Sequence, residues 1–595
     1  MAFAGTDTLS AQVGIYFSGA PLSDSVYLRL VSAEVDTSLT LPSRFRLAFR
    51  DSDGTVIGDS GATLTLPVQL HWNDQKILDG EITAIDLEYG PEGRLTIIRG
   101  LDKSYKLMYG TQTRAYMEMT ASDTVEQLIG DADVQPGAID PTDITYPVLT
   151  QANVSPWVFI QQLAALSNRM AFADSNGSFH FVKEISTDAA PEPATEGTRL
   201  IPGQLAMGFN LVRIRASVSS AEQVSEVHVR GWDPEQMEAV VGSANTQTTM
   251  ISTSEEPAVL AGTVGAKTFV DVSRSFQSQA EAESRAQAIA GDFGATFTEI
   301  EGEATAAYWL EAGTPFSLAF AGDPFDGKYV CTSARHVFEP ANRGYTVWFN
   351  AGGKRDRSLL SLGSEPLFAD AVIQSRVHGV VTGKVSSIKD PNLSGMVQVT
   401  FPWLDDDYVT DWCRVLQIGA GDGWGNIWMP EVNSEVLVAF DRGDPARPYV
   451  LGGLYNGIHK IAPQDDTELY DDGTGAWNQR MLQSRTHHTL YFNDDASSGC
   501  ILLKSGDGKH LLKFDQTGSG TVTLHSDGDI KIEGQNVTIT AQQNLQLAGQ
   551  EQLSLKGPKV QVNAEGELAV NSSGTASVKA DGPLSLSGAQ TSINA

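Results

Sequence analysis

The residues of this chain that could do chemistry are few, and their spacing suits none of the usual sites. His487 and His488 form an adjacent histidine pair, but neighbouring residues on a strand point to opposite faces. Two such rings chelate a single metal ion poorly, so a structural or solvent-facing role is favoured. The three aspartates at 405–407 could attract a cation, yet no glycine-punctuated calcium loop surrounds them, which favours an exposed acidic loop.

Two further patterns also predict structure and not catalysis. The stretch 421–425 reads Gly-Asp-Gly-Trp-Gly, but it lacks the Lys-Ser/Thr and the helix that follow a phosphate-binding loop, so we interpret it as a turn. Cys331, Cys413 and Cys500 lie far apart and form no C-x-x-C pair, which argues against a disulfide framework or a zinc cluster. We therefore predict no metal, no cofactor and no catalytic residue.

The bulk composition narrows the classes of partner. The 595 residues are enough for three or four domains, and 57 glycines suit a β-rich protein with many tight turns. The net charge of −32 argues against nucleic acid as a partner and against adsorption to an anionic membrane. We expect neither a signal peptide nor a membrane span, because the N-terminus lacks a basic and apolar leader and no run of about 18 apolar residues occurs. Together with the few cysteines, this predicts assembly in the cytoplasm.

Residues 1–365 predict a mixed domain that is mainly β. Alternating runs at 26–30, 44–49 and 94–98 indicate half-buried strands. Three helices are predicted between such strands: one at 122–129 capped by Ser122 or Asp123, one at 156–167 behind Ser155 and Pro156, and one at 278–293 that is rich in Ala, Glu and Gln.

The pattern changes after a connector at 366–376. The region 377–457 contains short strands separated by turn residues, at 379–388, 395–401, 412–416, 435–440 and 449–454. Five or six short strands in about eighty residues predict a small closed barrel of the OB type. A polar linker at 458–485 follows, and 486–520 then carries three apolar pairs: Leu490/Phe492, Ile501/Leu503 and Leu512/Phe514.

From 521 to 595 the chain is periodic. Ten i, i+2 pairs start at 522, 530, 537, 545, 553, 560, 568, 576, 584 and 591, which are steps of 8, 7, 8, 8, 7, 8, 8, 8 and 7 residues. Each pair puts two side chains on one face of a short strand, and glycine, asparagine or aspartate in the intervening residues permits a turn. Such regular punctuation is typical of a solenoid, and less so of a sandwich edge or a low-complexity tail.

The repeats of one chain cannot enclose a core, because a single chain would expose a stripe of apolar side chains and unpaired strand edges. Three chains wound about a common axis solve this, with the pairs meeting at the axis and ten repeats giving a rod of roughly 50 Å. The predicted axis residues are Val522, Leu524, Ile530, Ile532, Val537, Ile539, Leu545, Leu547, Leu553, Leu555, Val560, Val562, Leu568, Val570, Val578, Leu584, Leu586 and Ile593. The predicted fold class is therefore mainly β: a mixed α+β domain, an OB-fold barrel and an intertwined trimeric β-helix needle.

Several motifs of the barrel occur in a distinctive order. They are Phe401-Pro402-Trp403, Trp412-Cys413-Arg414-Val415, Gly421-Asp422-Gly423-Trp424-Gly425, Met429-Pro430-Glu431-Val432, Gly443-Asp444-Pro445-Ala446-Arg447-Pro448 and Tyr455-Asn456-Gly457. This order resembles the VgrG family, the central spike proteins of contractile injection systems, which are related to the hub and spike of contractile phage tails. The resemblance covers nearly the whole chain, with residues 1–365 similar to the phage-tail hub. Asn433 stands where the family often has glycine, and it still permits a turn.

The resemblance implies a homotrimer whose hub docks on inner tube and baseplate proteins. It also implies a separate PAAR-type tip protein, contacted by Ser592, Ile593, Asn594 and Ala595, and effector cargo. Some phage needles bind iron through histidines near the tip, whereas the last histidine here is His525, which favours a separate tip. The aspartates at 405–407 and the uninterrupted sequence Trp412-Cys413-Arg414 look closer to the spike proteins of extracellular, phage-tail-like particles than to those of type VI secretion systems. The expected location is an injection particle, extracellular or cell-associated, that meets the target membrane only transiently.

The prediction is a structural spike without enzyme activity, which joins the inner tube to the tip and pierces the target envelope mechanically. The interval between Gly457 and Leu490 is too short for a lysozyme domain, and the periodicity runs to Ile593, which leaves no room for an appended effector. One alternative is a tailspike or receptor-binding fibre with glycan-degrading activity, which would need a paired-carboxylate cleft on a long single-chain β-helix. A surface adhesin is the other, and it would need an export signal.

Overall fold

The computed structural model describes residues 13–72, 75–91, 93–221, 223–234, 236–263, 265, 267–340, 344–353, 376–392, 394–464 and 468–592. The chain forms two compact units, Met1–Ile461 and Ala462–Ala595. The predicted connector lies outside the described residues except for Arg376, and so do Ile593, Asn594 and Ala595. None of the helices in the described parts is long and apolar enough to cross a membrane.

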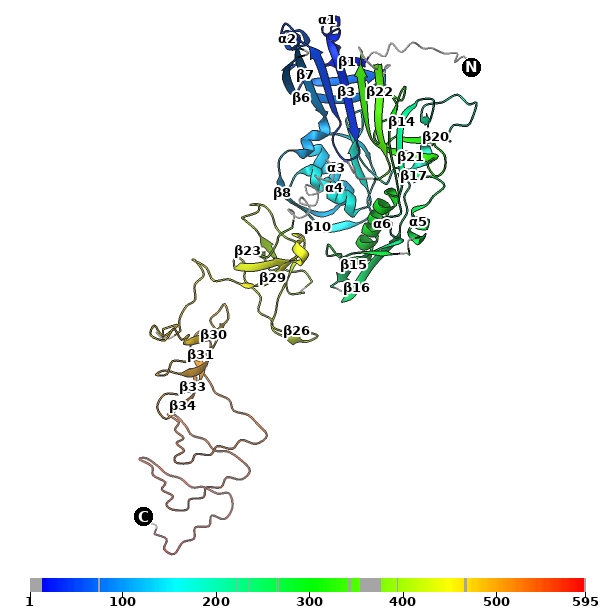
Figure 1. Ribbon diagram of the computed structural model, residues 1–595. Coiled ribbons are helices and arrows are strands. Elements are labelled where there is room, and N and C mark those ends of the chain that lie inside the picture. Colours follow the sequence, from blue (N-terminus) through cyan, green and yellow to red (C-terminus); the bar gives the residue numbers. More distant parts are fainter. Residues whose placement is uncertain are drawn as a thin grey trace. The chain divides into compact units, whose positions relative to one another are not determined.

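A 14-stranded sheet organises the hub, which is the part of the first unit before the connector. Strand β3 pairs with β21, so segments about 300 residues apart lie side by side (Figure 1). Alternation buries one face of these strands, as in β1, where Val13, Ile15 and Phe17 enter the core. The strand order is β14 (Leu211–Val218), β19 (Thr298–Ala304), β22 (Gly344–Ala351), β21 (Gly327–Glu339), β3 (Leu30–Ser38), β4 (Arg44–Arg50), β7 (Gly93–Asp102), β6 (Gln75–Gly90), β5 (Pro67–Trp72), β1 (Val13–Phe17) and β2 (Ala20–Pro21), with β13 (Gln204–Ala206), β17 (Ile251–Ser252) and β20 (Pro315–Ala319) attached to it.

Three longer helices and three small sheets make the second hub core, around Trp157, Phe179 and Phe276. The helices are α3 (Ala121–Asp131), α4 (Pro156–Leu166) and α6 (Gln279–Ala295). The sheets are β8 (Gln112–Thr120) with β10 (Thr145–Val154), β9 (Gln135–Ile139) with β11 (Met170–Ala173) and β12 (Ser178–Val182), and β15 (Glu226–Asp233) with β16 (Glu238–Asn245) and β18 (Thr268–Asp271). The described part of the hub also contains the short helices α1 (Asp24–Tyr27), α2 (Val56–Ser60) and α5 (Pro257–Thr263) and 3-10 turns at Lys103–Met108 and Thr187–Ala189.

The predicted helices at 122–129, 156–167 and 278–293 are confirmed, with two corrections nearby. The cap of α3 is Thr120, whose side chain forms a capping box with Asp123, so the prediction of Ser122 or Asp123 as cap is wrong. The predicted strand at 26–30 is also wrong, because Asp24–Tyr27 forms the one-turn helix α1. Only Val26 of that turn is buried, and Leu28 is exposed. The alternating apolar residues that predicted a strand therefore do not form one buried face.

The predicted small barrel is confirmed as a closed sheet in the order β23-β24-β25-β29-β28. Its core contains Val385, Val399, Phe401, Val438 and Val450. The glycine-rich stretch 421–425 is a turn, as predicted, and lies in a two-stranded hairpin outside the barrel wall. The bounds are β23 (Val380–Ser387), β24 (Met396–Thr400), β25 (Cys413–Val415), β26 (Ala420–Gly421), β27 (Trp424–Gly425), β28 (Glu435–Phe440) and β29 (Pro448–Gly453), with a 3-10 turn at Asp441–Gly443.

The second unit begins with an antiparallel meander of five strands, joined in chain order. They are β30 (Gln479–Gln483), β31 (Thr489–Asn493), β32 (Cys500–Lys504), β33 (His510–Asp515) and β34 (Thr521–Ser526). Strand β30 falls inside the predicted polar linker, which the sequence pattern did not reveal. Beyond Ser526 the described chain forms no strand and runs as extended segments separated by bends.

Candidate functional site

The meander β30–β34 carries an apolar ladder on one face. The register makes Leu482, Leu490, Leu503, Leu512 and Leu524 successive cross-strand partners, one from each strand. A second row on the same face joins Phe492, Ile501, Phe514 and Val522 in the same way. All nine side chains are exposed or only half-buried within the single chain.

The opposite face of this sheet already has its own small core. Tyr491, Cys500 and Leu502 are buried there, and Met481 and Leu511 pack against them. Among the residues that the structure describes, none forms a layer over the ladder. At roughly 80 Å² of apolar area for each side chain, the nine residues present about 700 Å², which exceeds the largest patch of an ordinary monomer. A surface of this kind marks an interface.

The segment after the meander repeats the same one-sided design. Its bends lie at 527–528, 535–536, 542–543, 550–551, 558, 565–566, 573–574, 581–582 and 589. Each bend begins five residues after the start of an apolar pair, so the backbone turns once in every repeat. The large apolar side chains of these repeats are between 49% and 81% exposed, from Ile530 to Leu586. A single chain thus leaves the whole series without a core.

The predicted axis residues fall into two groups in the structure. Val522 and Leu524 lie on β34, where they end the two rows of the apolar ladder. Those from Ile530 to Leu586 lie on the bent segment, and Ile593 is outside the described residues. Of the predicted tip-contact residues only Ser592 is described, and it is exposed. The site prediction omitted the ladder residues before 522, although their i, i+2 pairs had the same signature as the repeat.

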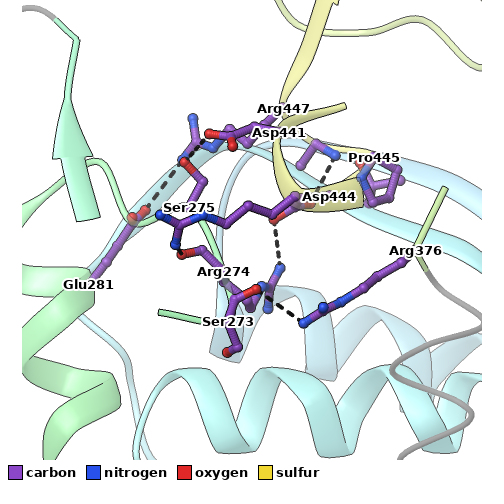
Figure 2. A network of polar contacts seen from close by, with 12 residues as sticks. Ser273, Arg274, Ser275, Glu281, Arg376, Asp441, Asp444, Pro445 and Arg447 are labelled. Atoms are coloured by element: carbon purple, nitrogen blue, oxygen red, sulfur yellow. Dashed lines mark hydrogen bonds and ion pairs between the residues drawn. The ribbon is translucent and has the colours of Figure 1, made fainter. Parts of the chain in front are cut away.

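A polar junction joins the hub to the barrel within the first unit (Figure 2). The barrel contributes the loop 441–447, and the hub contributes the segment 272–281. Arg274 of the hub donates to Asp444 at 3.2 Å, and Ser275 donates to Asp441. Arg442 of the loop, whose φ is 51°, donates to the backbone carbonyls of Val272 and Arg274 at 2.6 and 2.7 Å.

Further bonds from the two sides reinforce this junction. Arg447 lies 3.8 Å from Glu281, and Arg376, just before the barrel, donates to the carbonyl of Ser273 at 3.1 Å. The charge of Asp444 raises the pKa of Arg274, so this guanidinium stays protonated. No group in the described part of the chain hydrogen-bonds the hydroxyl of Tyr146, and this residue lines a cavity of about 60 Å³, which has room for water. The junction therefore anchors the barrel to the hub by charge and by specific hydrogen bonds.

The residues first weighed for chemistry make local backbone contacts or are buried. His487 occupies a turn with a φ of 65°, and Nδ1 of His488 accepts a hydrogen bond from the backbone of Gly506. Asp405 accepts from the backbone of Asp407 within an exposed turn. Burial raises the pKa of the Cys413 thiol to about 12, which keeps it protonated. Over the described ranges no group of three His, Cys, Asp or Glu residues could hold a metal ion.

Sequence comparison assigns the barrel to a known family. Residues 381–455 match the type VI secretion system/phage-baseplate injector OB domain, and residues 48–339 match a model described as the Alg8 N-terminal domain. The type VI secretion system spike protein VgrG1c of Pseudomonas aeruginosa is 42% identical over 84 residues, 13% of this chain and 12% of that protein. The corresponding spike protein VgrG3 of Vibrio cholerae is 35% identical over 135 residues, 21% of this chain and 12% of that protein. The matched region is similar to VgrG-type spike proteins.

The likeness of this chain to a solved structure extends beyond the barrel. A chain of the Francisella PdpA-VgrG complex in its half-lidded form has a similar fold, with a TM-score of 0.51 over 87% of this chain and 88% of that chain. The two sequences are only 10% identical, so the similarity concerns the fold alone. The sequence matches, by contrast, each span about an eighth of the length of the two curated VgrG proteins.

Proposed function

We propose that this chain is the homotrimeric hub and spike of a contractile injection particle. In this role it joins the inner tube to a PAAR-type tip and pierces the target envelope mechanically. The observation that carries the proposal is the one-sided apolar surface of the second unit, which continues from the ladder of β30–β34 into the repeats after Ser526. Such a surface is stable in water only when another apolar surface covers it, and copies of the chain would provide that surface for one another.

Three copies fit the repeat better than one or two. Each repeat supplies two modest apolar side chains, and three strands per layer are needed to surround an axis. Stacked layers about 4.8 Å apart would form a rod of roughly 50 Å from ten repeats. Backbone hydrogen bonds between copies would then satisfy the groups that the bent segment leaves unpaired within its own chain.

The ends of the chain suit different partners. The hub, with its large sheet, would dock on inner tube and baseplate proteins, and residues 592–595 would receive the tip protein. Assembly would take place in the cytoplasm before the particle acts at the cell surface or outside the cell. The curated relatives that match the barrel are named as spike proteins, which supports a structural role. We propose that the injection system is of the extracellular, phage-tail-like class. We also propose that the spike carries effector cargo.

The alternative, a fibre with glycan-degrading activity, has less support. It requires a single-chain β-helix with a cleft that holds two carboxylates. Residues 527–592 form no strand pairs within the chain, and their repeats are too thin to wall such a cleft.

The decisive experiment is the native mass of the full chain. A homotrimer of the 63.8 kDa chain has a mass of about 191 kDa. Light scattering after gel filtration, at several protein concentrations, should give this value with no monomer at micromolar concentration. A monomeric full-length chain would overturn the proposal.

A further inference from the structure

The barrel carries an apolar arm that its own core does not use. The arm comprises residues 416–428, which leave the barrel after β25 and return before β28. Its large apolar side chains are exposed: Ile418 is 95% exposed, Ile427 88% and Trp424 71%. Asp422 is the only charged residue of the arm in a chain in which 19% of residues are charged. The arm thus has the composition of an interface.

Local contacts give the arm a defined shape without a partner. Ala420 pairs with Gly425 and Gly421 pairs with Trp424, which closes a short hairpin. The side chain of Gln417 accepts from the backbone N–H of Trp428 at 2.9 Å, which joins the two strands at the base.

The glycines of the hairpin have a packing reason. A Cβ on Gly421 would lie 2.4 Å from the Trp424 indole, so this ring lies directly on the glycine. A Cβ on Gly425 would lie 2.3 Å from the carbonyl of Gly419. The arm is therefore held in shape by its own chain, and Ile418 and Ile427 are left free for contact.

We propose that this arm packs on the barrel of a second copy of the chain, so that the three barrels of the spike form a ring. This inference rests on the proposed homotrimer and names a contact of the trimer outside the C-terminal unit. Tyr455 at the end of the barrel and Ile458 just after it are also exposed, so one chain carries both an apolar arm and other apolar surface to receive one. Such head-to-tail contacts close into a ring in a cyclic trimer.

The size of the arm decides between a second copy and a free partner. With Leu416 and Trp428 added to the three residues above, five exposed side chains offer roughly 500 Å² of apolar area, or about 1,000 Å² with the receiving surface. This area is at the low end for a stable complex of free proteins. Three barrels tethered by a common shaft, however, meet at millimolar effective concentration. A contact with a Kd of about 0.1 mM would then be occupied about ten to one, whereas a free partner at micromolar concentration would not bind.

Hydrogen–deuterium exchange on the full-length chain tests the inference. The comparison is between the wild-type trimer and a Leu524→Asp variant, in which a charge in the apolar ladder should keep the chains apart. Ten-to-one occupancy predicts that amides of the arm exchange about tenfold more slowly in the trimer. Ile418→Ser with Ile427→Ser should abolish this protection and leave the mass of the trimer unchanged. Val259→Ser, at an apolar position on α5 that is 57% exposed, should change neither.

The outcomes separate the inference from the proposed function. A wild-type trimer whose arm exchanges as fast as in the monomeric variant overturns the arm contact and leaves the trimeric spike intact. Protection that persists in the monomer, or in the double serine variant, also overturns it. If the wild-type chain is itself monomeric, the proposed function fails, and the inference fails with it.

Discussion

The substitution Leu524→Asp tests the apolar ladder at the point where the meander meets the repeat. Leu524 is the cross-strand partner of Leu512 and the last residue of its row. The neighbouring residue Thr523 lies on the opposite face of the same strand, next to Lys513. Thr523→Asp is therefore a matched control, with the same charge added one position away on the same exposed strand.

The expected effect on assembly is large. Removing one leucine from an apolar interface forfeits about 2 kcal/mol per chain. An unpaired carboxylate in a dry position adds several kcal/mol, which gives a total on the order of 15 kcal/mol for three chains. Even a third of this total weakens association more than a thousandfold. Thr523→Asp remains in water in either state and should change association by less than about 0.5 kcal/mol.

The pH dependence gives a second readout. In a trimer, burial and mutual repulsion would raise the pKa of the three introduced carboxyl groups above the value of about 4 in a separate chain. The assembled state would then bind protons more tightly, so lowering the pH from 8 to 4.5 should partly restore the trimer of Leu524→Asp. Light scattering at both pH values measures this. A Leu524→Asp chain that remains trimeric at pH 8, with the thermal midpoint of Thr523→Asp, would refute the inward-facing ladder.

Three other predictions concern the repeat, the junction and the hub. Ile532→Asp should speed hydrogen exchange over residues 527–545 at least tenfold, because a buried charge opens that layer of the shaft locally. The control Lys531→Asp, one residue away, should leave the exchange rate unchanged. Equal exchange in both variants would count against apolar pairs that meet at the axis. Asp444→Asn should lower the stability of the first unit by only about 0.5–1 kcal/mol, because the partner Arg274 is 40% exposed and solvent screens the ion pair. A double-mutant cycle with Arg274→Gln that shows no coupling energy would contradict the junction. Burial lowers the pKa of His336 to about 4, so the unfolded chain binds this proton more tightly and the hub loses up to about 3 kcal/mol as the pH falls from 6.5 to 4. His336→Gln should flatten that part of the stability curve in urea unfolding, and an unchanged slope would contradict the assignment.

Local patterns in the sequence were enough to predict much of the fold. The helix behind Ser155 and Pro156 forms as predicted, because the cap and the ring constraint act within a few residues. The strand at 435–440 also has the predicted bounds, since its alternation reflects one buried face. The one-turn helix at Asp24–Tyr27 escaped prediction because a single buried valine imitates strand alternation.

The sequence by itself determined the spacing of the C-terminal repeat, because apolar side chains every 7 or 8 residues are a property of the chain order alone. Only the tertiary structure showed that Leu482, Leu490, Leu503, Leu512 and Leu524 align as one row, since strand register depends on turn lengths and pairing. The same holds for the junction, where Arg274 and Asp444 are 170 residues apart and meet through the packing of hub and barrel. Periodicity is a local property that can be read from the sequence, whereas contacts between residues far apart in the chain are determined by the fold.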